Sequence, residues 1–89
     1  MALFGGPMKV LRDRVGRANF NLSVISPVTP EMVAAFEQGI LDAALLAAAK
    51  GHGTEVRAFL ASERSDHPTW KERDIWNGML ERVAEKITT

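Results

Sequence analysis

Few side chains in this sequence could take part in catalysis or bind a metal ion. The 89-residue chain has two histidines, His52 and His67, and no cysteine. A protein metal site takes three or four His, Cys, Asp or Glu ligands held close together. Here His52, Asp66 and His67 could be combined only if two separate turns of the chain met. We therefore expect neither a bound metal nor a cofactor.

The motifs of phosphate binding and nucleophilic catalysis are not found either. The stretch Gly5-Gly6-Pro7 lacks the lysine and the helix context of a phosphate-binding loop. No serine has the neighbours that would activate it as a nucleophile. The absence of cysteine rules out thiolate chemistry and a disulfide framework. We therefore expect that the protein is not an enzyme.

The fold is expected to be built on a long helix between Thr29 and Lys50. Thr29 can cap a helix with its hydroxyl, and Pro30 suits the first helical position. Gly51 follows as a stop signal. At about 100° per residue, the apolar side chains of this helix cover a face too wide for a simple surface helix. These side chains are Val33, Phe36, Ile40, Leu41, Ala44, Leu45, Ala47 and Ala48.

Two features of this helix are candidate contact sites for a partner. The small residues Ala35, Gly39 and Ala43, continued by Ala47, form a ridge that could let another helix approach closely. The alternative is that Gly39 is an exposed weak spot in the helix. Glu37 lies within the apolar arc, where it either pairs with an arginine, reaches solvent, or faces a bound partner.

The segment before the central helix is basic and changes its pattern halfway. Apolar residues at helical spacing predict a short helix that begins at Pro7 and frays near Gly16. Residues 19–26 then alternate between polar and apolar, which predicts an extended connector or a short edge strand. At the very start, Leu3 and Phe4 form an apolar tip that we expect to pack on this chain or on a neighbour.

Two further helices are predicted after Gly51. The first begins at a Thr54 cap and runs to about Arg64, and the second runs from a Thr69 cap to about Ile87. The inward positions of the last helix are Trp76, Met79, Leu80, Val83 and Ile87. Trp70 lies off this stripe, so it is either a lid over the edge of the core or an exposed aromatic of the kind that anchors interfaces.

These patterns predict a mostly α-helical protein: a small bundle of three to four helices on a long central helix, with an N-terminal extended segment or short edge strand. We divide the single domain into a basic N-terminal arm, residues 1–28, and a helical domain, residues 29–89. The arm has four basic residues and one acidic residue, whereas the remainder has seven basic and ten acidic residues. The four basic residues of the arm are Lys9, Arg12, Arg14 and Arg17.

The sequence predicts no membrane-spanning helix and no secretory signal peptide. Glu37 and Asp42 interrupt the alanine-rich helix, so no run of 18 apolar residues exists. The apolar start, Met1 to Phe4, is too short for a signal-peptide core. We therefore expect the protein in the cytoplasm or in a virus particle.

Protein binding is the function that these observations favour. We expect a structural or adaptor subunit of a multi-subunit assembly, such as a phage or virion particle, that packs on copies of itself or on another protein. Two alternatives remain: a nucleic-acid-binding protein that uses the basic arm, and a small inhibitor or immunity-type protein that blocks a partner enzyme. With four basic residues and Asp13 among them, the arm would neutralise at most about four phosphates, so nucleic acid is the less favoured partner.

Overall fold

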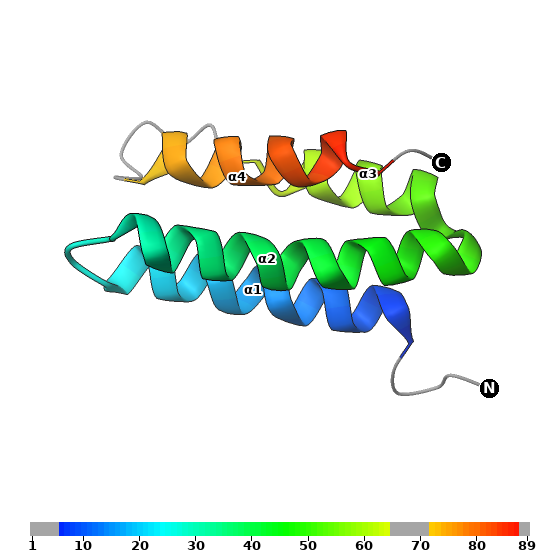
Figure 1. Cartoon of the computed structure of the whole chain (residues 1–89), viewed down its shortest axis with the longest axis horizontal. Helices are drawn as coiled ribbons and strands as arrows, with labels where there is room; N and C mark the ends of the chain where they lie inside the picture. The colour runs from blue at the N-terminus through cyan, green and yellow to red at the C-terminus, as the bar shows by residue number, and fades with distance from the viewer. Residues whose placement is uncertain (1–5, 65–71, 88–89) are drawn as a thin grey trace.

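The chain folds as a small, mostly helical bundle, as predicted. The computed structural model describes residues 6–64 and 72–87, and no strand occurs within these two ranges. α1 and α2 run antiparallel in one layer, and α3 and α4 lie across them in a second layer (Figure 1). The elements are α1 (Pro7–Val24), α2 (Pro30–Ala47), the π-helical turn η1 (Ala48–His52), α3 (Gly53–Ser62) and α4 (Arg73–Glu85).

Helix α1 is longer than the sequence pattern suggested, and the prediction of an extended segment or strand in residues 19–26 is wrong. The helix continues without interruption through Gly16 and ends at Val24. Met8, Leu11, Val15, Ala18 and Leu22 are its buried side chains. Spacings of three and four residues therefore persist along the whole segment, which is the helical period.

The alternation of Phe20, Leu22 and Val24 suggested a strand. Leu22 fits the two-residue period of a strand as well as the 3.6-residue period of a helix, so this residue alone does not distinguish the two. In a strand, all three side chains would share one face. In the helix, Leu22 is buried, whereas 66% of Phe20 and 61% of Val24 is exposed. Two of the three apolar side chains that a strand would place on one face thus face solvent in the helix.

Helix α2 begins as the sequence predicts. The Thr29 hydroxyl oxygen accepts a hydrogen bond from the backbone N–H of Met32 at 3.2 Å, and Pro30 occupies the first turn. The predicted break at Gly51 is also present, because Gly51 has a φ of 95°, a conformation that suits glycine. The cap predicted at Thr54 is wrong, since α3 already begins at Gly53 and has no side-chain cap.

One hydrophobic core joins the two layers. It contains the buried residues of α1 together with Ile40 and Ala44 of α2, Val56 and Leu60 of α3, and side chains of α4. All five inward positions predicted for the last helix are buried: Trp76, Met79, Leu80, Val83 and Ile87. The segment predicted as a basic arm therefore contributes to the same core as the rest of the protein.

Polar contacts join α4 to the two residues that follow α3. The indole N–H of Trp76 donates to the backbone carbonyl of Glu63 at 2.7 Å. An ion pair joins Arg64 to Glu81 at 2.7 Å. The buried indole thus has a hydrogen-bond acceptor, which a tryptophan inside a core requires.

Candidate interaction surface

Two of the four basic residues of α1 form ion pairs with carboxylates of the same chain. Lys9 Nζ lies 2.9 Å from Asp13 Oδ2, one helical turn away. Arg12 Nη2 lies 3.7 Å from Glu55 Oε2 of α3, and its guanidinium carbon lies 5.8 Å from the ring centre of Phe59. A cation at this distance from an aromatic ring is attracted to the ring face. These two residues thus contribute to the surface contacts of the fold itself.

Arg14 and Arg17 lie next to α2 and differ in how they are bonded. Arg14 Nη1 donates to the backbone carbonyl of Gly39 at 3.0 Å, which fixes its guanidinium on α2. Arg17 is exposed and makes no hydrogen bond or ion pair with any residue in the described part of the chain. Of the four predicted basic contact residues, Arg17 is thus the most available for another molecule.

A shallow cleft of about 250 Å³ lies where these arginines meet α2. Arg14 and Arg17 supply its cationic groups, and its remaining lining is apolar or small. The latter residues are Ala18 of α1 and Ala35, Phe36 and Gly39 of α2. The cleft therefore combines positive charge with apolar surface.

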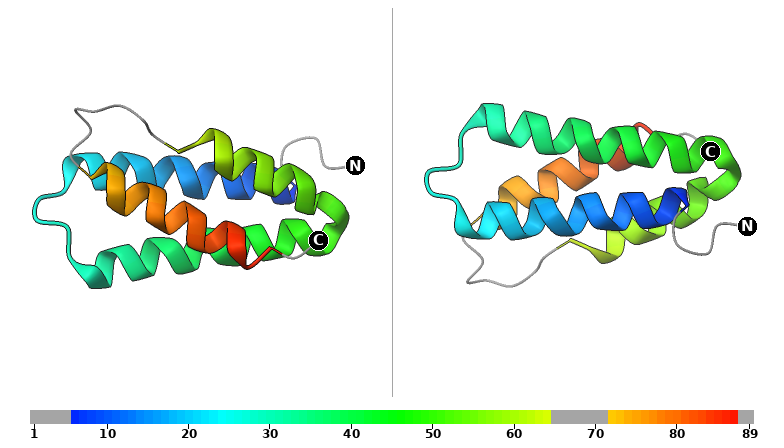
Figure 2. Two further views of the ribbon diagram at one scale, coloured as in Figure 1. Left: turned by 90° about the horizontal axis from the view of Figure 1, so that it is seen from above. Right: turned by 90° about the horizontal axis from the view of Figure 1, so that it is seen from below.

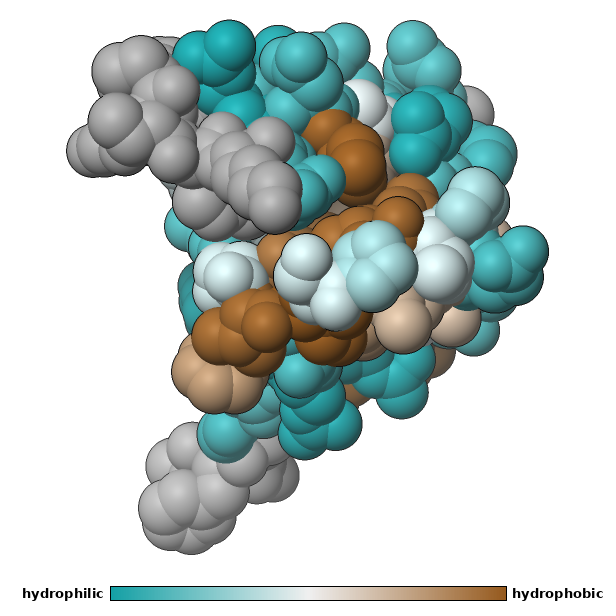
Figure 3. Space-filling view, turned by 90° about the vertical axis from the view of Figure 1, so that its left-hand side faces the viewer, coloured by the Kyte–Doolittle hydropathy of each residue, from teal (hydrophilic) through white to brown (hydrophobic). Residues whose placement is uncertain are grey.

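Apolar side chains gather at the end of the bundle where α1 connects to α2. Figure 3 views this end and shows a brown, apolar band across it. Phe20 and Val24 are exposed there on the last turns of α1, and Ile25 and Val28 of the connection are partly exposed. We call these four residues the end patch. Exposed apolar side chains that gather in this way are typical of interaction sites.

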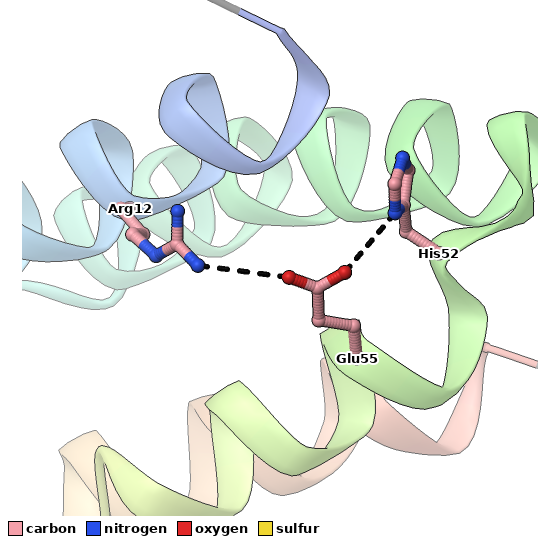
Figure 4. Close-up of polar contacts among 3 residues, drawn as sticks. All are labelled: Arg12, His52 and Glu55. Carbon is pink, nitrogen blue, oxygen red and sulfur yellow. Dashed lines mark hydrogen bonds and ion pairs between the residues drawn. The ribbon is translucent and has the colours of Figure 1, made fainter.

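A polar cluster links α1 to the η1–α3 junction. Glu55 lies between Arg12 and His52, with its Oε1 atom 3.1 Å from His52 Nδ1 (Figure 4). Such a pair could transfer a proton, but about half of each side chain is exposed to solvent. Exposed ion pairs contribute only about 0–1 kcal/mol. The cluster is best explained as a surface contact between helices.

The hypothetical metal ligands Asp66 and His67 lie outside the described residues. Within residues 6–64 and 72–87, no group of three His, Asp or Glu side chains is placed to hold a metal ion.

Glu37, which the sequence places in an apolar arc, is bonded to α4. Its Oε1 atom accepts hydrogen bonds from Arg82 Nε at 2.9 Å and from Arg82 Nη2 at 2.7 Å. These hydrogen bonds, together with the negative charges of Glu37 and Glu85, raise the pKa of Arg82. Only 18% of the Glu37 side chain is exposed, compared with 49% of Arg82. The geometry matches the arginine-paired alternative.

Replacing Glu37 with Gln should destabilise the protein by about 1 kcal/mol. A hydrogen bond to a charged group contributes about 1.5–3 kcal/mol, and solvent around Arg82 reduces that contribution. Chemical denaturation should show the loss at low salt and a smaller loss at high salt. Asp74→Asn is the matched control, because 96% of that side chain is exposed and its ion pair with Arg73 is 3.7 Å long, so its change should lower the midpoint less than Glu37→Gln does. Equal midpoints for both variants and the wild type would contradict a stabilising Glu37–Arg82 pair.

The small-residue ridge of α2 is only partly covered within the described chain. Ala43 and Ala47 are buried, whereas Ala35 is exposed. A Cβ atom built at Gly39 would lie 4.0 Å from Arg14 Nη1, an ordinary van der Waals distance. The monomer thus does not require glycine at this position for close packing of two helix backbones.

Replacing Gly39 with Ala should therefore stabilise the monomer by about 0.5–1 kcal/mol. Alanine has the higher helix propensity, and the added methyl group has room beside the guanidinium of Arg14. A thermal melt should show a higher midpoint than that of the wild type. A lower midpoint would mean that Gly39 is packed more tightly than its surroundings indicate.

Three predicted contact residues, Leu3, Phe4 and Trp70, lie outside the described residues. Sequence reasoning missed Phe20 and Val24 as surface residues because it assigned them to an extended connector or a short edge strand. Extending the helical spacing of Val15 and Ala18 by one more turn reaches Leu22 and leaves Phe20 and Val24 on the opposite face. That continuation was the signal in the sequence that could have identified them.

Among the described residues, the helical stretch Pro30–Ser62 is long and apolar enough to cross a membrane by length and composition alone. Its mean hydropathy reaches 1.5 over an 18-residue window, of which 28% is buried in the fold. A core helix of a soluble protein meets the same criterion. Leu45 and Leu46 are among the exposed apolar side chains of this stretch, so α2 has more apolar surface than the described core covers.

Searches of protein families, curated proteins and solved structures found nothing that matches this chain.

Proposed function

We propose that this chain is a non-enzymatic protein-binding module, a structural or adaptor subunit of a multi-subunit assembly. The observation that carries the proposal is the end patch, in which Phe20 and Val24 are 66% and 61% exposed. Large aromatic and aliphatic side chains of this kind form the buried centres of protein interfaces. A partner that covers the end patch would remove this apolar surface from water and gain the corresponding free energy.

The bonding of the basic residues supports a protein partner over a nucleic acid. Lys9 and Arg12 already lie beside carboxylates, and Arg14 donates to a backbone carbonyl. Affinity for nucleic acid comes mainly from cations that replace counterions at the phosphates. Carboxylates of the chain thus balance two of the four cations, which leaves only Arg14 and Arg17 to neutralise phosphates.

The experiment that tests this function is a mass measurement by sedimentation velocity across a wide range of concentration. The double variant Phe20→Ser, Val24→Ser should keep the thermal midpoint of the wild type, because both side chains are exposed. If the partner is a second copy, the wild type should show a larger mass at high concentration and the variant should remain monomeric.

A wild-type monomer at every concentration would direct the search to a different protein as the partner. The same double variant should then fail to bind that protein in a pull-down from native extract. Full binding by the variant, in either the mass measurement or the pull-down, would contradict the proposal.

A further inference from the structure

The cleft between α1 and α2 differs from the end patch because it adds charge to apolar surface. Arg14 is held on the Gly39 carbonyl through Nη1, so its position is fixed while its other N–H groups stay available. Arg17 lies on the same wall of the cleft, one helical turn further along α1. Two guanidinium groups thus border one small volume, and Phe36 and Ala35 contribute the apolar lining.

We propose that this cleft binds a carboxylate side chain of a partner protein, an Asp or Glu flanked by apolar residues. Guanidinium groups bond carboxylates through paired, charge-assisted hydrogen bonds. The apolar lining would contact the methylene groups of the acidic residue and the apolar residue beside it. A helix with Glu and Leu four residues apart presents these two side chains on one face.

The size of the cleft favours a side chain over a free small molecule. Its volume of about 250 Å³ is below the range of about 300–1,000 Å³ that is usual for small-molecule sites.

The cleft is continuous with the end patch along α1. Phe20 and Val24 follow Arg17 at spacings of three and seven residues, which places all three on one side of the helix. A partner helix that covers the end patch would therefore also reach the cleft. This inference rests on the proposed function, because it names the chemistry by which the same partner is recognised.

The test is a titration of the full-length, isotope-labelled protein followed by NMR at the arginine side chains. The probe is a synthetic helical peptide with Glu and Leu four residues apart, and the matched probe has Gln in place of Glu. We expect the Glu peptide to shift the Nε–H signals of Arg14 and Arg17 and the ring signals of Phe36. It should bind about tenfold more tightly than the Gln peptide, which corresponds to about 1.4 kcal/mol.

Matched variants separate this inference from the proposed function. Arg17→Gln should reduce binding of the Glu peptide about tenfold, whereas Lys50→Gln should leave it unchanged because Lys50 is exposed in η1, outside the lining of the cleft. Phe20→Ser should weaken both peptides alike, because it removes apolar contact. If Phe20→Ser weakens both peptides while Arg17→Gln changes neither, the cleft inference fails and the end patch remains a binding surface. If neither variant changes any binding, both fail.

Other occupants would be recognised in the same titration. Equal affinity for the Glu and Gln peptides would overturn the inference. The inference would also be overturned if another anion shifted the arginine signals at a lower concentration than the Glu peptide does. The anions to test are inorganic phosphate, sodium acetate and a single-stranded oligonucleotide. Movement of these signals on dilution of the wild type, but not of Arg17→Gln, would show that a second copy supplies the carboxylate and would support the inference.

Discussion

Replacing Trp76 with Ala should destabilise the protein by about 3–5 kcal/mol. Trp76 is fully buried, and its truncation leaves a large cavity in the core that joins the two layers. It also removes the hydrogen bond to the Glu63 carbonyl. A domain of this size has about 5–15 kcal/mol of total stability, so much of it would be lost. Circular dichroism during urea unfolding should show a midpoint far below that of the wild type.

The variant Trp76→Phe separates the cavity from the hydrogen bond. Phenylalanine keeps most of the buried ring but has no N–H to donate to Glu63. We expect an intermediate loss, larger than that of a surface substitution and smaller than that of Trp76→Ala. If Trp76→Ala unfolded at the wild-type midpoint, the indole could not lie in the core.

Replacing Leu22 with Ala should cost about 2–4 kcal/mol, whereas replacing Phe20 with Ala should change stability by less than about 0.5 kcal/mol. The reason is the helical register of α1, which buries Leu22 and exposes Phe20. A strand would place both side chains on one face and make both substitutions costly. Chemical unfolding of the two single variants under the same conditions measures the difference.

Similar losses for both variants would contradict the helical register of residues 19–24. Comparing Leu22→Ala with Phe20→Ala is a sensitive test of the register because phenylalanine is the larger side chain. If only burial mattered and both were inside, Phe20→Ala would be the more damaging change.

The sequence predicted the helices where strong local signals agree. At the start of α2, the Thr29 cap and Pro30 act together with a long apolar period, and the helix begins at Pro30. In α4 and just after it, five apolar residues at helical spacing were assigned to the core, and all are buried. Local signals of this kind depend on neighbours along the chain, so they can be read without the fold.

The same reasoning did not predict the end of α1 correctly, because two local signals conflict there. Asparagine, phenylalanine, serine and valine between Asn19 and Val24 have modest helix propensity, and the alternation of polar and apolar residues fits a strand. Burial of Ala18 and Leu22 in the core favours the helix instead. Tertiary packing therefore determines the helical conformation of residues 19–24, which local propensity alone does not specify.

The polar contacts of the candidate surface join residues far apart in the sequence. Glu37 pairs with Arg82 across 45 positions, and Arg14 reaches the Gly39 carbonyl across 25. Sequence reasoning placed Glu37 in an apolar arc and allowed for an arginine partner, but it could not name Arg82. It also grouped four basic residues, of which the fold bonds three within the chain. Only the structure shows that Arg17 is the one available for another molecule.

The proposed function depends most on whether the α1 surface beside Phe20 and Val24 contacts a partner. The sequence has no cysteine, so a cysteine introduced at Ser23 is unique and can carry a photo-crosslinker. Ser62→Cys is the matched control, because both serine hydroxyls are exposed and donate to the carbonyl three residues earlier at 2.7 Å.

The direct measurement is photo-crosslinking of the two labelled proteins in native extract, with mass spectrometric identification of the adducts. We expect one dominant protein adduct at Ser23, either a second copy or a single other protein, that excess unlabelled wild type competes away. The Ser62 label should give at most a trace of it. No adduct at Ser23, or the same adducts at both sites, would contradict a protein-binding surface at this end of α1.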